Sequence, residues 1–227
     1  MKIAEIFYSI QGEGMLTGVP SVFVRTSGCN LRCEWCDTPY TSWSPEGNEM
    51  SIAAILETVK QYPARHAVVT GGEPMIAPGI VELTQSLRGL GLHVTVETAG
   101  TVHHQVACDL MSISPKLANS TPREREGGKW AAQHDRVRYQ PEVLKQLMAE
   151  YEYQLKFVVA SPEDMAEIAA VLKEMSADRS RVVLMAEGVT SDVIRERAAW
   201  LSEICKREGF RYSPRLHIDL WGNRRGV

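Results

Sequence analysis

The sequence predicts an α/β fold in which a mostly parallel sheet carries helices on its outside. From about residue 51 onward, helix-like and strand-like segments alternate, which is typical of strands joined by crossover helices. An apolar content of 44% in 227 residues is enough to bury one sizeable core. The chain also shows no internal repeat. We therefore expect one domain that spans residues 1–227.

The alternating elements start with a helix. Ser51 stands at an N-cap position, and apolar residues follow it at helical spacing as far as Pro63. A short buried strand at 66–70 then enters a glycine turn, and a helix at 78–90 precedes Gly91. Further strands are expected at 92–97, 110–113, 155–159 and 182–185, and further helices are expected to open at Ser161, with proline at the first helical position, and to span 193–207.

Two segments fit no regular element. Residues 117–140 are rich in Gly, Arg, Glu and Asn and are too long for a plain connector, so we expect either an active-site cover or a mobile stretch. Residues 214–227 form a basic tail with His217 and Trp221. This tail is expected to meet substrate, a partner subunit or only solvent.

Charge and hydropathy exclude several classes of partner. The net charge is −3 and the pI is near 6.1. The sequence has no block of consecutive Lys and Arg of the kind that binds nucleic acid or an anionic membrane surface. No apolar run approaches the roughly 18 residues of a membrane span, and the N-terminus lacks the apolar centre of a signal peptide. We therefore expect a cytoplasmic protein that binds neither nucleic acid nor membrane.

Three of the five cysteines lie close together, which favours metal ligation over disulfides. Cys29, Cys33 and Cys36 are spaced so that one loop can wrap a single inorganic cluster. A structural zinc ion normally takes four protein ligands, and the nearest histidine after the loop is His66. Three thiolates on a four-iron cluster leave one iron open to a small chelating ligand. A zinc knuckle and a redox thiol set remain alternatives.

Other notable residues follow predicted strands. In parallel folds the chemistry gathers at the carboxyl ends of the strands. The segments 70–74, 97–98 and 114–116 all stand there. We expect them to converge on one site.

The cysteine loop, with Trp35 just before its last cysteine, resembles that of the radical S-adenosylmethionine superfamily. The Gly-Gly-Glu-Pro segment at 71–74 resembles a second motif of that superfamily. Glycines there let the backbone come close to a ligand. The resemblance implies a 4Fe-4S cluster on Cys29, Cys33 and Cys36, with S-adenosyl-L-methionine as its partner.

Within that superfamily the chain resembles the 7-carboxy-7-deazaguanine synthase family. The similarity runs in order through most of the chain, in the segments 5–14, 17–25, 36–38, 70–74, 96–101, 114–116 and 154–158. It implies an incomplete, modified TIM-type barrel, with a partial parallel sheet and outer helices. It also implies a magnesium ion, a homodimer and an external electron donor such as a flavodoxin or ferredoxin.

The resemblance also assigns residues to the site. It assigns Thr38 as the magnesium ligand. The residues assigned to the pterin-like substrate are Ile10, Gln11, Gly12, Arg25 and Thr70. The residues assigned to the cofactor are Trp35, Cys36, Asp37, Gly72, Ser114, Pro115, Lys116, Gln154 and Lys156. Read without the resemblance, these residues have plainer roles. Arg25 is then an exposed strand residue and Thr38 a turn cap. Lys156 either snorkels to solvent or faces the cofactor.

The implied reaction is that of a carbon–nitrogen lyase. It converts 6-carboxy-5,6,7,8-tetrahydropterin to 7-carboxy-7-deazaguanine with loss of ammonia, on the route to queuosine and related deazapurines. Two alternatives remain open. A glycyl-radical-enzyme activase shares the cysteine spacing but lacks the segment 11–14, and a non-catalytic zinc or iron–sulfur binding module would need only the cysteine loop.

Overall fold

The computed structural model describes residues 1–227 and contains one sheet of nine strands, in the order β3-β1-β2-β4-β5-β6-β7-β8-β9. β1 runs antiparallel to β2 and β3, and every neighbouring pair from β2 to β9 is parallel. The strands are β1 (Lys2–Ile10), β2 (Pro20–Thr26), β3 (Asn48–Glu49), β4 (His66–Gly71), β5 (His93–Thr98), β6 (Leu110–Ile113), β7 (Tyr153–Val159), β8 (Val182–Ala186) and β9 (Arg211–Ser213). The sheet stays open, with β3 and β9 at its edges, so the predicted partial parallel sheet is confirmed.

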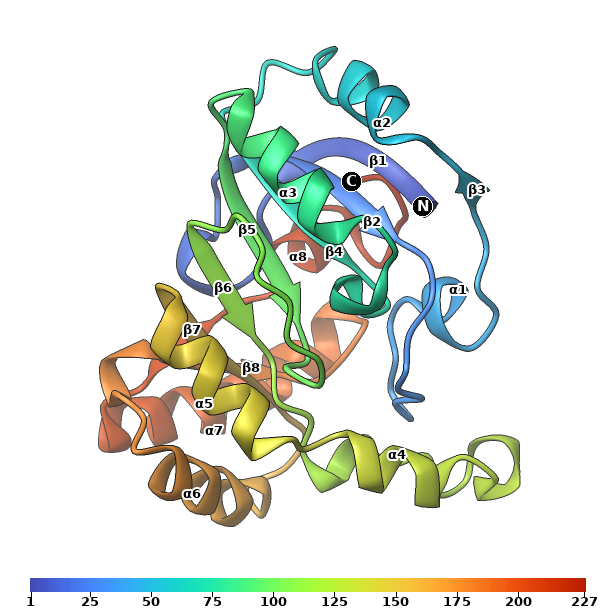
Figure 1. Ribbon diagram of the computed structural model, residues 1–227. Coiled ribbons are helices and arrows are strands. Elements are labelled where there is room, and N and C mark those ends of the chain that lie inside the picture. Colours follow the sequence, from blue (N-terminus) through green and yellow to red (C-terminus); the bar gives the residue numbers. More distant parts are fainter.

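Eight α-helices surround the sheet or connect its strands (Figure 1). They are α1 (Pro39–Ser42), α2 (Ile52–Val59), α3 (Ile80–Gly89), α4 (Ala131–Val137), α5 (Pro141–Glu150), α6 (Asp164–Met175), α7 (Ser191–Glu208) and α8 (Leu216–Trp221). In Figure 1, α3 lies across β4 and β5, and α4 lies beyond the carboxyl end of β6. No helix is both long enough and apolar enough to cross a membrane.

The two faces of the sheet differ in chemistry because side chains alternate along each strand. In β7, Leu155 and Phe157 enter the main apolar core with the outer helices, while Lys156 and Val158 line a cavity on the other face. In β2, Val24 likewise enters the core and Arg25 faces the cavity. The inner face therefore presents polar side chains from strand after strand to a single space.

Most predicted elements stand where the sequence places them. Ser51 caps α2, and its hydroxyl accepts a hydrogen bond from Ala54 N at 3.2 Å. The helix expected to open at Ser161 instead begins at Asp164, so this boundary is wrong. The Asp164 carboxylate accepts the N–H groups of Ala160 and Ser161, at 2.7 and 3.1 Å. These donors are satisfied before the helix begins, and Ser161 does not act as its cap.

The segment 117–140 is neither a cover nor structureless. It contains two 3-10 turns, Ala118–Ser120 and Arg125–Gly128, followed by α4. None of its residues lines the cavity. Instead it packs behind the cysteine loop, where Ser120 O accepts from Glu34 N at 2.8 Å. The expected role in covering the active site is therefore wrong, and the segment supports the loop from outside.

Candidate active site

A cavity of about 590 Å³ lies at the carboxyl ends of the parallel strands. Its volume falls within the range of roughly 300–1,000 Å³ that is usual for small-molecule sites. The convergence expected from the sequence is confirmed for three segments, since Thr70, Glu97 and Ser114 all line this space. The cysteine loop, the segment after β1 and the C-terminal tail complete its walls.

The three clustered cysteines all lie on the cavity wall, and no cysteine of the chain forms a disulfide. Burial raises the pKa of Cys29 to about 12 and raises that of Cys33 as well. Buried thiols of this kind are protonated until a metal displaces the proton. The loop therefore offers three sulfur ligands that become thiolates when metal binds.

No three His, Cys, Asp or Glu side chains converge on a point that could hold a single metal ion. A zinc knuckle requires such convergence, because its ligands all contact one ion. An iron–sulfur cube does not, because each thiolate binds a different corner. Three sulfur donors on one loop at the cavity therefore fit a cluster that is held at three of its corners.

The Gly-Gly-Glu-Pro segment joins the end of β4 to the cysteine loop. A Cβ on Gly72 would overlap the carbonyl oxygen of Gly28 and lie 2.7 Å from that of Thr41. Glu73 N also donates to Gly28 O at 2.9 Å. The glycine thus permits close packing of two backbones, in addition to any approach to a ligand.

The Glu73 side chain is almost completely buried and ties this segment to the end of β5. Its carboxyl accepts from Met75 N at 3.0 Å, Thr98 Oγ1 at 2.7 Å and Ala99 N at 2.8 Å. Burial raises its pKa, and these three donors act in the opposite direction. Glu73 therefore fixes the strand ends that frame the cavity, and it does not line the cavity itself.

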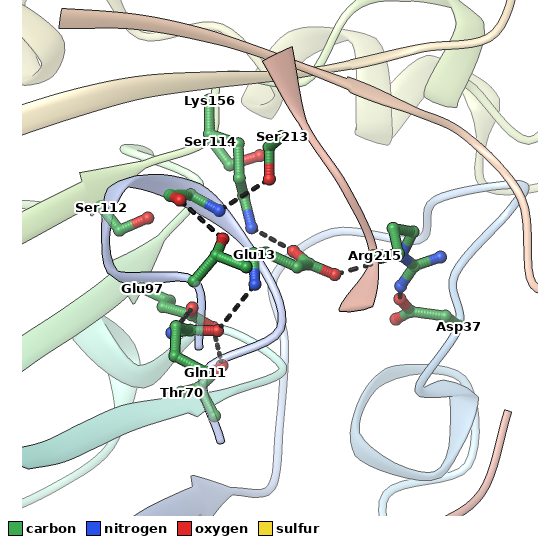
Figure 2. Close-up of polar contacts among 12 residues, drawn as sticks. Gln11, Glu13, Asp37, Thr70, Glu97, Ser112, Ser114, Lys156, Ser213 and Arg215 are labelled. Atoms are coloured by element: carbon green, nitrogen blue, oxygen red, sulfur yellow. Dashed lines mark hydrogen bonds and ion pairs between the residues drawn. The ribbon is translucent and has the colours of Figure 1, made fainter. Parts of the chain in front are cut away.

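A polar group at the base of the cavity links the segment after β1 to β4 and β5 (Figure 2). Glu97 accepts from Gln11 Nε2 at 3.0 Å and from Thr70 Oγ1 at 2.8 Å. Gln11 Oε1 accepts in turn from Glu13 N at 3.2 Å. Gln11 and Thr70 are therefore held in fixed orientations by one carboxylate.

Beside this group lies a buried network of charges that joins four chain segments (Figure 2). Glu13 forms ion pairs with Lys156 and with Arg215, and Arg215 also binds Asp37 and the carbonyl of Gly188. Burial opposes ionisation of Glu13 and Asp37, but the neighbouring cations outweigh it and lower both pKa values. The pKa of Lys156 is raised despite its burial, chiefly by Glu13. The network is therefore fully ionised at neutral pH.

Two cations in the cavity keep donors free for a ligand. Arg25 uses Nε to bind Glu5 at 2.7 Å, and its two terminal nitrogens make no hydrogen bond to the protein. Lys116 forms no ion pair; its Nζ donates to Ser114 Oγ at 2.8 Å and lies 5.8 Å from the Trp35 ring centre. Both are suited to an anionic ligand group.

Nearly all of the site residues expected from the sequence meet in this cavity. Those that line it are Ile10, Gln11, Gly12, Arg25, Cys29, Cys33, Trp35, Cys36, Asp37, Thr38, Thr70, Gly72, Ser114, Lys116 and Lys156. Pro115 and Gln154 are buried and do not line it. Gln154 instead binds the segment after β1, accepting from Met15 N at 2.7 Å and donating to Ser112 Oγ at 2.7 Å.

Sequence reasoning missed several residues of the site. Two of them could have been found from the sequence. Glu13 lies in the segment 5–14 that resembles the family, and Ser112 is a polar residue within a buried strand. Arg215 carries no such signal, because its partners Glu13 and Asp37 are distant in sequence. Part of the C-terminal tail lies where it could meet a substrate. His217 and residues 223–227 line the cavity, whereas Trp221 does not.

Comparison with known proteins adds independent findings. The model of the Radical SAM superfamily matches residues 23–117. The 7-carboxy-7-deazaguanine synthase of Halobacterium salinarum is 47% identical, over 98% of this chain and 91% of the relative, and that of Rhodopirellula baltica is 46% identical, over 100% and 89%. The crystal structure of QueE from Escherichia coli superposes with a TM-score of 0.67 at 28% identity, covering 93% of this chain and 92% of that one.

The open parallel sheet and the cysteine-lined cavity at its carboxyl edge define a radical S-adenosylmethionine enzyme. A 4Fe-4S cluster and S-adenosyl-L-methionine are the cofactors that this superfamily implies, and the three sulfur donors fit the cluster. Similarity over the full chain goes further than the superfamily. The chain belongs to the 7-carboxy-7-deazaguanine synthase family. It is not grouped with the glycyl-radical activases.

Proposed function

We propose that this protein is a carbon–nitrogen lyase that converts 6-carboxy-5,6,7,8-tetrahydropterin to 7-carboxy-7-deazaguanine and ammonia, for queuosine and related deazapurines. One observation carries the proposal. A single cavity brings the three-cysteine loop together with the polar group of Gln11, Thr70 and Glu97 and with the free fork of Arg25. Family membership supplies the reaction, and the cavity supplies a place for it.

The cysteine side of the cavity suits the cofactors. When bound there, the cluster and S-adenosyl-L-methionine would supply the electron and the carbon radical that start the reaction. Cys29, Cys33 and Cys36 would hold the cluster. Lys116 and the backbone of Gly72, which both line the cavity, would meet the polar end of S-adenosyl-L-methionine, because Lys116 has no carboxylate partner of its own. The other proposed cofactor contacts, Trp35, Asp37 and Lys156, line the same cavity.

The same cavity also suits the substrate. The terminal nitrogens of Arg25 can bind a carboxylate through two parallel hydrogen bonds. Gln11 and Thr70 present polar atoms in orientations fixed by Glu97, which fits an edge of a pterin ring. Ile10 and Gly12 line the same cavity.

The decisive experiment is anaerobic turnover. Reconstituted protein is incubated with reductant, S-adenosyl-L-methionine, magnesium and the carboxytetrahydropterin, and the product is identified by mass spectrometry. We expect the deazaguanine acid and ammonia in equal amounts. Cys33→Ala should lose both bound iron and product. Product formation by a cluster-free Cys33→Ala protein would refute the proposed chemistry.

We also propose that Thr38 ligates magnesium. It precedes α1, its side chain makes no capping hydrogen bond, and the residue lines the cavity. A hard cation bound through oxygen can orient a substrate carboxylate. Thr38→Ala is expected to lower the magnesium-dependent rate by roughly 10-fold or more, as loss of a ligand or its support does. Thr38→Ser should retain the response, and an unaltered magnesium titration in Thr38→Ala would exclude this role.

Three further features belong to the same proposal. The electron donor is proposed to be a flavodoxin or ferredoxin, and the protein to act as a homodimer, both on family resemblance; light scattering tests the second. A cytoplasmic location is supported by the free thiols, which suit a reducing compartment. Cell fractionation tests it.

A further inference from the structure

The cysteine loop is held from behind by residues that do not line the cavity. Arg32 N, between the first two cysteines, donates to His134 Nδ1 at 3.1 Å. Glu34 N, between the second and third, donates to Ser120 O at 2.8 Å. Between each pair of successive cysteines, one backbone N–H thus donates to the segment 117–140, which contains α4.

The imidazole of His134 is fixed in one tautomer. Its side chain is almost completely buried, and Nε2 lies 2.9 Å from Ser120 Oγ. Ser120 Oγ donates its own proton to Leu117 O at 2.6 Å, so it accepts from Nε2. Because Nε2 carries the ring proton, Nδ1 is left as the acceptor for Arg32. Burial lowers the pKa of His134 to about 4, which keeps Nδ1 unprotonated at neutral pH.

The destination of these N–H groups matters for an iron–sulfur cluster. Hydrogen bonds to the ligating sulfurs are among the factors that set its reduction potential. In this loop, Leu31 N donates to Cys29 Sγ at 3.3 Å. The next amide in the chain, that of Arg32, is turned to His134 instead. The N–H of Cys36 is taken by Cys33 O at 3.3 Å.

We propose that His134 is a positioning residue that sets the hydrogen bonding around the cluster by binding the backbone N–H of Arg32. It holds the loop between Cys29 and Cys33 and keeps one amide away from the sulfurs. Fewer N–H groups on sulfur keep the reduction potential low, and a strongly reducing cluster is what the proposed reaction needs. The inference rests on the proposed function only in that the three cysteines hold a cluster.

Two substitutions at one position separate this role from simple packing. His134→Phe keeps a ring but removes the acceptor, whereas His134→Asn places an oxygen near the position of Nδ1. Ser120→Ala is a third variant, since it leaves the ring in place and removes the group that fixes its tautomer. After reconstitution, bound iron is measured, and the reduction potential is obtained by a redox titration followed by electron paramagnetic resonance. No substrate is present.

The Phe variant is expected to shift the reduction potential to more positive values and to alter the resonance spectrum. The Ser120→Ala variant should shift the potential in the same direction by a smaller amount. The Asn variant should match the unsubstituted protein. A Phe variant with unchanged potential and spectrum would overturn the proposal, as would an Asn variant shifted as far as the Phe variant. If the Phe variant takes up no cluster, the other two variants decide. An unshifted Asn variant together with a more positive potential in Ser120→Ala would support the proposal, and an unchanged potential in Ser120→Ala would overturn it. Failure of the unsubstituted protein to bind iron would refute the proposed function itself, which keeps the two tests distinct.

Discussion

Position 72 has no room for a side chain larger than that of glycine, because two other backbone segments approach it closely. The residue follows β4 and faces the carbonyl oxygens of Gly28 and Thr41, which flank the cysteine loop. Backbone atoms of this kind cannot rotate out of the way as a flexible side chain can. Any Cβ at position 72 must therefore push the cysteine loop away from the strand end.

Gly72→Ala should accordingly reduce both stability and iron uptake. Overpacking a rigid site costs typically about 1–3 kcal/mol, and the displaced loop carries all three cluster ligands. Gly89→Ala is the matched control, because nothing lies within 4 Å of a Cβ there and the residue is helical. Chemical unfolding and iron content after reconstitution measure the two effects. A Gly72→Ala protein with normal iron content would show that the loop can adjust.

At the scale of the elements, much of the parallel part of the fold could be predicted, because most of its strands and helices carry their own local signal. β6 lies at the predicted residues 110–113, and α2 begins at the predicted cap. The antiparallel strand β1 and the short strands β3 and β9 were not predicted. β9 has only three residues and is defined by pairing with β8, so it has no pattern of its own.

The polar positions inside the strands are the clearest site signal that local reasoning can use. Lys156 interrupts an apolar strand; it is buried and lines the cavity, so it does not snorkel to solvent, and its contact with the cofactor stays a prediction. Arg25 is half-buried and lines the cavity, so the alternative in which it is an exposed strand residue is wrong. Arg215 could not have been found in this way, because burial among Glu13 and Asp37 depends on tertiary contacts over long sequence separations.

The segment 117–140 shows the limit of composition as a guide. Its many Gly, Arg and Glu residues suggest irregular structure, but the buried contacts of His134 and Ser120 with the cysteine loop order it. These contacts again depend on sequence-distant partners. A short helix such as α4 is stabilised mainly by packing, so its own seven residues predict it poorly.

Across the whole molecule, the charge network joins the first and last parts of the chain. Glu13 follows β1, Asp37 ends the cysteine loop, Lys156 lies in β7 and Arg215 precedes α8. Backbone hydrogen bonds support the same connection, since Leu216 N donates to Gly12 O at 2.9 Å. The N-terminal segment and the C-terminal tail are thus fixed to each other across the cavity.

This network should give stability a pH dependence of known sign. The folded-state pKa of Glu13 lies below its unfolded value of about 4.3, so its contribution is present above that pH and is lost as pH falls through the folded pKa. The pKa of Lys156 is raised above about 10.4, so its contribution is present below that pH and is lost as pH rises further. Between these limits both contributions are complete.

Glu13→Gln should therefore lower the free energy of unfolding most at neutral pH. Removing one partner of a buried ion pair costs about 3–5 kcal/mol, because Lys156 remains buried without its counter-ion and Arg215 keeps only Asp37. Below about pH 4.3 the difference from the unsubstituted protein should shrink, because Glu13 then takes up a proton in the unfolded chain while it stays ionised in the folded protein. Denaturant unfolding at a series of pH values measures this difference. Glu203→Gln, which affects an exposed pair with Lys206, should show little difference at any pH. A Glu13→Gln difference that stayed constant down to about pH 3 would show that folding does not lower the pKa of Glu13.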